Sequence, residues 1–299
     1  MIGTEERAKP LLKAFEAGLQ DRGYAVGQNL FLEVRLSDGD PDRLRALAEE
    51  LVALKPDVIL ASEITGLFLK GKTSTIPIVL HSSADPVAAG LVQSLARPGT
   101  NVTGMAGLMF PLVTKQVELL TELVPGMSRL AFFAPPFDPP KDNPYYGRPE
   151  PWEFATRAAA KAKGLELVVL KVHDSESLRA AFAVLERERP HGLVIPTNAV
   201  ILRLGDQILE GARRLRLPAV YPVLSLAEGG GLLSYGQNFV ENFRYAAKFV
   251  DLILRGARPA EIPVEQPWKF ELVVNQKTAR ELGLTIPQSI LLRADRVIE

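Results

Sequence analysis

Residues 57–85 read DVILASEITGLFLKGKTSTIPIVLHSSAD, and this stretch decides the fold class. The runs at 57–61 and 76–80 are almost continuously apolar and rich in β-branched residues, as in strands that are buried on both faces of a parallel sheet. The segment between them predicts a helix that includes residues 64–72. Two parallel strands joined by a helix predict an α/β fold, with right-handed crossovers and helices on both faces of the sheet.

The same alternation continues along the chain. Six or more strand–helix units in 299 residues exceed what one sheet and one hydrophobic core usually accommodate, so two domains are expected. Asp40 and Pro41 form a typical N-cap and first-turn pair for one of the helices. Further strands are predicted at 129–133, 165–172, 192–195 and 218–221, and further helices at 42–54, 176–188 and 239–254.

The composition narrows the range of functions. The chain has 35 basic and 35 acidic residues and no long run of like charge, so nucleic acid is not an expected partner. It has no cysteine, which excludes disulfides, thiolate nucleophiles and cysteine-ligated metals. No apolar run approaches the ~18–20 residues of a transmembrane helix.

One stretch, from Gly66 to Thr73, matches the phosphate-binding pattern G-x-x-x-x-G-K-[ST]. A phosphate loop needs a helix that begins at its lysine and threonine. Here Thr73 is soon followed by the predicted strand from Ile76, and Leu67, Phe68 and Leu69 would be left in solvent. The helical interpretation therefore fits better, and a P-loop nucleotide hydrolase is an alternative that rests on this match alone.

Other catalytic signatures are missing from the sequence. It contains no G-x-S-x-G, H-E-x-x-H or G-x-G-x-x-G pattern, and its three histidines lie far apart, so no enzyme activity, metal or cofactor is expected. In open α/β sheets, ligands bind outside the carboxyl ends of the strands. The segments that follow the predicted strands are rich in hydroxyls, amides and carboxylates, for which helix capping is the alternative role.

Several motifs, taken together, resemble a known family. They are Ile76-Pro77-Ile78-Val79, Ala84-Asp85-Pro86-Val87, the segments 90–92, 94–99 and 101–104, Gly230 to Gly236, Pro263 to Leu272, Leu282 to Pro287 and Arg293-Ala294-Asp295. In combination, and over nearly the whole chain, they are similar to bacterial ABC-transporter substrate-binding proteins of the tryptophan or aromatic amino-acid type. That family has the type 1 periplasmic binding fold.

The resemblance implies two doubly wound α/β lobes with parallel sheets, joined by three crossing strands near 103–110, 233–238 and 263–268, which close on a ligand by hinge motion. The expected N-terminal lobe contains residues 1–105 and 237–264, and the expected C-terminal lobe contains 106–236 and 265–299. The first strand of the family is truncated here to Met1-Ile2, so a longer natural precursor is expected.

The implied function is the capture of a small solute in the cleft between the lobes and its delivery to a membrane ABC permease. The protein is expected to act as a monomer in the periplasm or outside the cell, although this chain contains no signal peptide. A ligand sensor of the same fold, acting on a regulatory partner, is the alternative.

The expected solute is an α-amino acid with an aromatic or branched side chain. The alternative follows from Glu63, which stands where the family has a small residue and could select a cationic or carboxylate-free solute. The predicted contacts are Ser62, Thr65 and Ser83 for the carboxylate, Glu63, Asp85, Asp138 and Asn198 for the ammonium group, Phe137, Tyr221 and Tyr235 for the side chain, and Thr4 and Ser82 beside them.

Overall fold

The computed structural model describes residues 5–38, 40–82, 85–107, 109–135, 151–266 and 270–299. These residues form two units. Unit 1 contains the described residues of 1–108 and 239–268, and unit 2 contains those of 109–141, 145–238 and 269–299.

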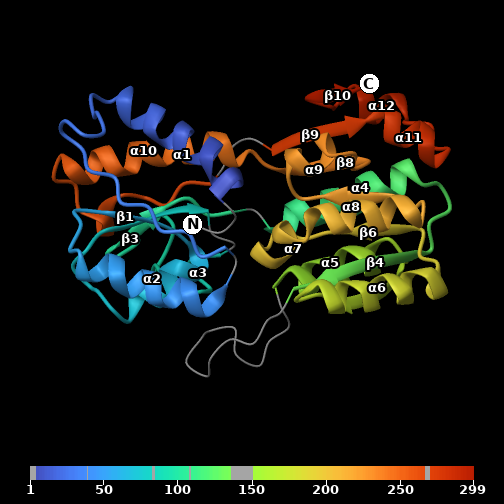
Figure 1. Ribbon diagram of the computed structural model, residues 1–299, viewed down its shortest axis with the longest axis horizontal. Helices are drawn as coiled ribbons and strands as arrows, with labels where there is room; N and C mark the ends of the chain where they lie inside the picture. Colours follow the sequence, from blue (N-terminus) through green and yellow to red (C-terminus); the bar gives the residue numbers. More distant parts are fainter. Residues whose placement is uncertain (1–4, 39, 83–84, 108, 136–150, 267–269) are drawn as a thin grey trace. The chain divides into compact units, whose positions relative to one another are not determined.

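Unit 1 is a parallel sheet with helices on both faces (Figure 1). Its strands, in spatial order, are β1 (Ile59–Ser62), β2 (Ile78–Ser82) and β3 (Val102–Gly104). The helices α1 (Glu5–Gln20) and α10 (Phe239–Leu254) cover one face, and α2 (Pro41–Ala53) and α3 (Glu63–Lys70) cover the other. Within the described residues, β1 pairs only with β2.

Unit 2 is a larger sheet with the spatial order β10-β9-β8-β7-β6-β4-β5, in which only the β8–β9 pair is antiparallel. Its strands are β4 (Arg129–Ala134), β5 (Glu166–Lys171), β6 (Gly192–Val194), β7 (Ala219–Tyr221), β8 (Leu233–Gln237), β9 (Phe270–Asn275) and β10 (Arg296–Ile298). Its helices are α4 (Met109–Leu123), α5 (Pro151–Ala162), α6 (Ser175–Glu188), α7 (Ala199–Arg203), α8 (Gly205–Arg214), α9 (Leu224–Glu228), α11 (Gln276–Leu282) and α12 (Gln288–Leu291).

Local sequence signals explain where the helices begin. The Asp40 carboxylate accepts hydrogen bonds from the backbone N–H groups of Asp42 and Arg43, so α2 begins at Pro41 as expected from this N-cap pair. Asp174 and Ser177 form a reciprocal capping box at the start of α6. The predicted parallel α/β architecture is confirmed in both units.

The boundaries between the units differ from the predicted lobe boundaries by a few residues. They fall at 108/109, 238/239 and 268/269, whereas the sequence suggested 105/106, 236/237 and 264/265. Backbone hydrogen bonds explain the shift at two of them. Glu265 donates its N–H to the carbonyl of Gly104 and accepts one from Ala106, which ties both segments to unit 1.

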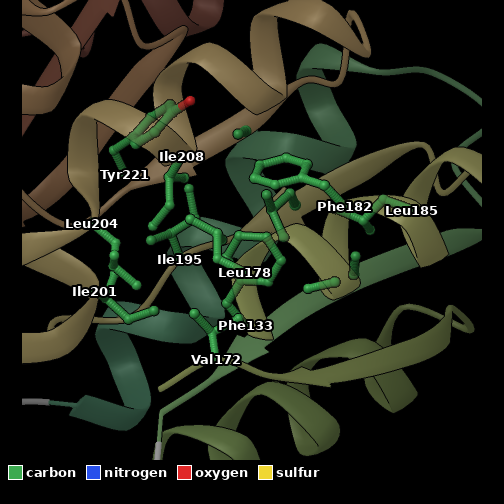
Figure 2. Packing of buried hydrophobic residues seen from close by; sticks show 14 of the residues in the cluster. Phe133, Val172, Leu178, Phe182, Leu185, Ile195, Ile201, Leu204, Ile208 and Tyr221 are labelled. Atoms are coloured by element: carbon green, nitrogen blue, oxygen red, sulfur yellow. The ribbon is translucent and has the colours of Figure 1, made fainter. Parts of the chain in front are cut away.

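One hydrophobic core of unit 2 lies between its sheet and the helices α6 to α9. Figure 2 shows Phe133, Phe182 and Leu178 at its centre, where the rings of Phe133 and Phe182 pack edge to face with centroids 5.6 Å apart. Gly211 of α8 lies directly against the Phe182 ring, and a Cβ atom at this position would overlap that ring. The absence of a side chain at Gly211 therefore sets how closely α8 approaches α6.

We predict that Gly211→Ala destabilises unit 2 by about 1–3 kcal/mol, because the added methyl group overpacks a buried aromatic contact. The matched control is Gly71→Ala at the end of α3, where φ is −85° and no atom lies within 4 Å of the new Cβ. Urea denaturation measures both changes. Equal stabilities for the two variants would contradict the packing argument.

A buried histidine stands at the end of β2 in unit 1. His81 is 9% exposed and its ring lies 4.4 Å from that of Phe243 in α10. Its Nδ1 has no hydrogen-bond partner among the described residues. Burial lowers the pKa of His81 to about 3, because the imidazolium form would lose its hydration. His81 is therefore neutral in the folded protein at pH 7.

This burial predicts a loss of stability in acid. Between the unfolded pKa of about 6.5 and the folded pKa, only the unfolded chain binds the proton, so stability falls as the pH is lowered. The His81 contribution is about 2 kcal/mol between pH 6.5 and pH 5. Urea denaturation of the wild type and His81→Leu at both pH values tests this. The variant should lose less stability on acidification than the wild type. Equal losses in the two proteins would contradict the assignment of this loss to His81.

Candidate functional site

The carboxyl ends of β1 and β2 bring five of the predicted contacts together in unit 1. Ser62 and Ser82 are paired in the β1–β2 register, after a shift between Ala61 and Ser62. Glu63 and Thr65 follow Ser62 in the first turn of α3, and Asp85 follows β2. This group, called the unit 1 edge below, consists of Ser62, Glu63, Thr65, Ser82 and Asp85.

Ser62 and Thr65 are occupied with capping α3. The Ser62 hydroxyl accepts a hydrogen bond from the backbone N–H of Thr65 at 3.4 Å and lies 3.0 Å from the Thr65 hydroxyl. Thr65 is 7% exposed. Helix capping is the alternative role that the sequence offers for such residues. Both side chains have that role in the structure.

Glu63 and Asp85 link α3 to the segment after β2. The Glu63 carboxylate accepts a hydrogen bond from the backbone N–H of Asp85, with 3.1 Å between nitrogen and Oε2. The Asp85 carboxylate in turn accepts from the N–H groups of Val87 and Ala88, at 3.1 and 2.9 Å. Two carboxylates are thus held at the same end of the sheet by backbone donors.

Ser82 and two apolar side chains complete this edge. The Ser82 hydroxyl is half-buried and has no hydrogen bond within the described residues. Ile64 and Val87, next in sequence to Glu63 and close to Asp85, are 44% and 40% exposed. The unit 1 edge therefore combines negative charge, one available hydroxyl and apolar surface, which suits a small solute with a cationic group and an apolar part.

In unit 2, the corresponding position lies at the carboxyl ends of β4 and β6. These neighbouring strands are the point where the chain order of the sheet reverses, which is where open α/β sheets bind ligands. Asn198 follows β6 and caps α7, with its Oδ1 accepting the N–H of Val200 at 2.8 Å. That contact uses one of the two lone pairs of the Asn198 oxygen.

The Asn198 oxygen keeps a second lone pair, so the predicted role of Asn198 as an ammonium acceptor stays a prediction. Thr197, directly before it, has a half-buried hydroxyl without a hydrogen bond in the described part of the chain. Thr197 was absent from the predicted contacts. Its position, after β6 and directly before the capping residue Asn198, is the sequence signal that could have included it among the candidate contacts.

The two predicted aromatic contacts Tyr221 and Tyr235 both lie on strands of the unit 2 sheet. Tyr221 is 2% exposed and lies in the core of unit 2 with Ile208, and burial raises the pKa of its phenol (Figure 2). The Tyr235 ring packs against Phe270 with centroids 5.9 Å apart, and burial, aided by the carboxylates of Asp295 and Glu118, raises its pKa. Tyr221 is the last residue of β7, but its burial in the core leaves it no surface for a ligand at this strand end. Tyr235 lies in the middle of β8 and is half-buried, so its role as a ligand contact stays a prediction.

The remaining predicted contacts lie outside the described residues. They are Thr4, Ser83, Phe137 and Asp138.

The stretch that matches a phosphate loop forms most of α3. Leu69 is fully buried in this helix, the helix ends at Lys70, and no helix begins at Lys72 or Thr73. The helical interpretation is confirmed. Among the described residues, no group of three acidic or histidine side chains could hold a metal ion. None of the described helices is both long enough and apolar enough to cross a membrane.

Comparisons with known proteins agree with this architecture. A curated relative, the tyrosine-binding protein of Clostridioides difficile, is 24% identical over 273 residues, which cover 91% of this chain and 76% of the relative. A conserved domain protein of Vibrio cholerae superposes with a TM-score of 0.89 at 26% identity, over 99% of this chain and 97% of the other.

A second solved structure, an ABC domain from Streptococcus pneumonia in complex with L-Trp, has a TM-score of 0.86 at 23% identity, over 99% of this chain and 98% of the other. The model of the ABC transporter substrate binding protein family matches residues 8–298. With a polar strand edge in each α/β unit and a match over nearly its whole length, the chain belongs to the family of ABC transporter substrate binding proteins.

Proposed function

We propose that the solute captured by this chain is an amino acid with an aromatic or branched side chain. The observation that carries the proposal is the unit 1 edge, where Glu63, Asp85 and the Ser82 hydroxyl stand beside exposed Ile64 and Val87. The carboxylates suit the charged end of an amino acid, and the apolar pair suits its side chain. The tyrosine-binding relative and the L-Trp complex support the same solute class.

The proposal includes a partner and a location. The solute is passed to a membrane ABC permease, and the protein acts as a monomer, without catalysis, in the periplasm or outside the cell. Membership of a substrate-binding family supports transport rather than chemistry. The balance of 35 basic and 35 acidic residues supports a small solute over nucleic acid.

We expect ligand binding to stabilise the folded protein. At about 100 times its dissociation constant, a bound solute adds about 2.7 kcal/mol to the free energy of unfolding. Urea denaturation with L-tyrosine, L-tryptophan, L-phenylalanine and L-leucine, beside glucose and Mg-ATP, measures this. Stabilisation by at least one amino acid is the expected result. Stabilisation by glucose or Mg-ATP alone would contradict the proposal.

The Ser82 hydroxyl is expected to contact the solute. Ser82→Ala should weaken binding about fivefold, which corresponds to a typical net hydrogen bond of ~1 kcal/mol. The control is Ser74→Ala, which removes an exposed hydroxyl before the amino end of β2 in the same unit. Titration calorimetry compares the two. If both variants bind like the wild type, Ser82 is not a ligand contact.

A further inference from the structure

A hollow lies at the amino ends of β7 and β8 in unit 2. Its volume is about 510 Å³, which is within the usual range for small-molecule sites. It is lined by the C-terminal part of α8, the segment directly before β8, and α11. Four of its lining residues are buried and mainly apolar: Leu217, Ala219, Tyr221 and Leu232. None of its residues belongs to the unit 1 edge, so the hollow is a separate candidate site.

The Tyr221 hydroxyl is a polar group of this hollow that lacks a partner. Tyr221 is 2% exposed, and its hydroxyl makes no hydrogen bond to any residue that the structure describes. Figure 2 shows its oxygen at the outer end of the ring, pointing away from the apolar side chains of the core. The backbone of Gly231 lies against the ring, where a Cβ atom would overlap it. Because buried polar groups nearly always have a partner, this hydroxyl indicates a group from outside the chain.

The charged residues around the hollow favour an anion. Three arginines and two glutamates line it, which gives a net charge of +1: Arg213, Arg214, Arg216, Glu210 and Glu281. Arg216 donates to the backbone carbonyl of Glu281 at 2.7 Å. The guanidinium groups of Arg213 and Arg214 have no hydrogen bond or ion pair within the described part of the chain. Two available guanidinium groups and a phenol are complementary to a negatively charged acceptor.

We propose that this hollow binds a small organic acid, in which a carboxylate is attached to an apolar body. Arg213 and Arg214 donate to the carboxylate, and the Tyr221 hydroxyl donates to an oxygen of the ligand. The apolar body packs against Leu217 and Leu232. The site lies entirely within unit 2 and goes beyond the proposed capture of an amino acid, so either proposal can fail without the other.

The test is titration calorimetry with 3-phenylpropionate and 4-methylpentanoate. Each acid is compared with the alcohol and the amine of the same carbon skeleton, which are 3-phenylpropan-1-ol, 3-phenylpropylamine, 4-methylpentan-1-ol and 4-methylpentylamine. At least one acid should bind. Its alcohol and its amine should bind more weakly by about tenfold or more, because neither offers a charged acceptor to the arginines.

Two variants test whether the acid binds in the hollow. Arg214→Gln removes one guanidinium group and should weaken binding about tenfold, as expected for a hydrogen bond to a charged group. Tyr221→Phe keeps the ring, removes the hydroxyl and should weaken binding about fivefold. The control is Arg179→Gln on α6, which removes an exposed guanidinium group that also lacks a partner among the described residues but does not line the hollow. The control should bind like the wild type.

The stability of the variants separates a ligand contact from a structural role. Since the Tyr221 hydroxyl has no partner among the described residues, Tyr221→Phe without ligand should unfold at the urea concentration of the wild type or at a higher one. A less stable variant would show that the hydroxyl has a partner within the chain, which would overturn the inference. No binding of either acid at about 1 mM, or equal affinities in the wild type, Arg214→Gln and Tyr221→Phe, would overturn it as well. None of these outcomes bears on amino-acid capture.

Discussion

The burial of parallel strands on both faces is the constraint on which the rest of this structure depends. Strands such as β2 and β4 are buried over all but one residue, so each needs a layer of the chain on either side. Parallel strands then require helical crossovers, and every crossover begins at the same edge of its sheet. Polar residues at the ends of strands that are far apart in the sequence therefore lie side by side at one edge of the sheet, as Ser62 and Ser82 do in unit 1.

This constraint explains why the fold could be predicted from the sequence. The run at 129–133 forms most of β4, and the N-cap pair of Asp40 and Pro41 begins α2 one residue before the predicted range. The predicted helix over 64–72 is α3, which removes the phosphate-loop interpretation. What the sequence did not indicate is the antiparallel β8–β9 pair, because strand direction depends on a return path and not on the composition of either strand.

The candidate site was less predictable, because one side chain can serve two purposes. Ser62 and Asn198 stand at or just after the end of a strand, and both cap the next helix. Tyr221 failed for a different reason. Alternate residues of a strand face opposite sides, and Ala219 and Tyr221 both point into the core under α8. The hydrogen bond from Asp85 to Glu63 joins residues 22 apart, and no local pattern could reveal it.

The central claim is that the chain captures an amino acid at the unit 1 edge. A crystal structure with bound L-tyrosine tests it most directly. The account predicts a polar atom of the ligand at about 3 Å from the Ser82 hydroxyl or from another polar group of this edge, with the ligand ring against Ile64 or Val87. L-tyrosine bound without any contact to the unit 1 edge would contradict it.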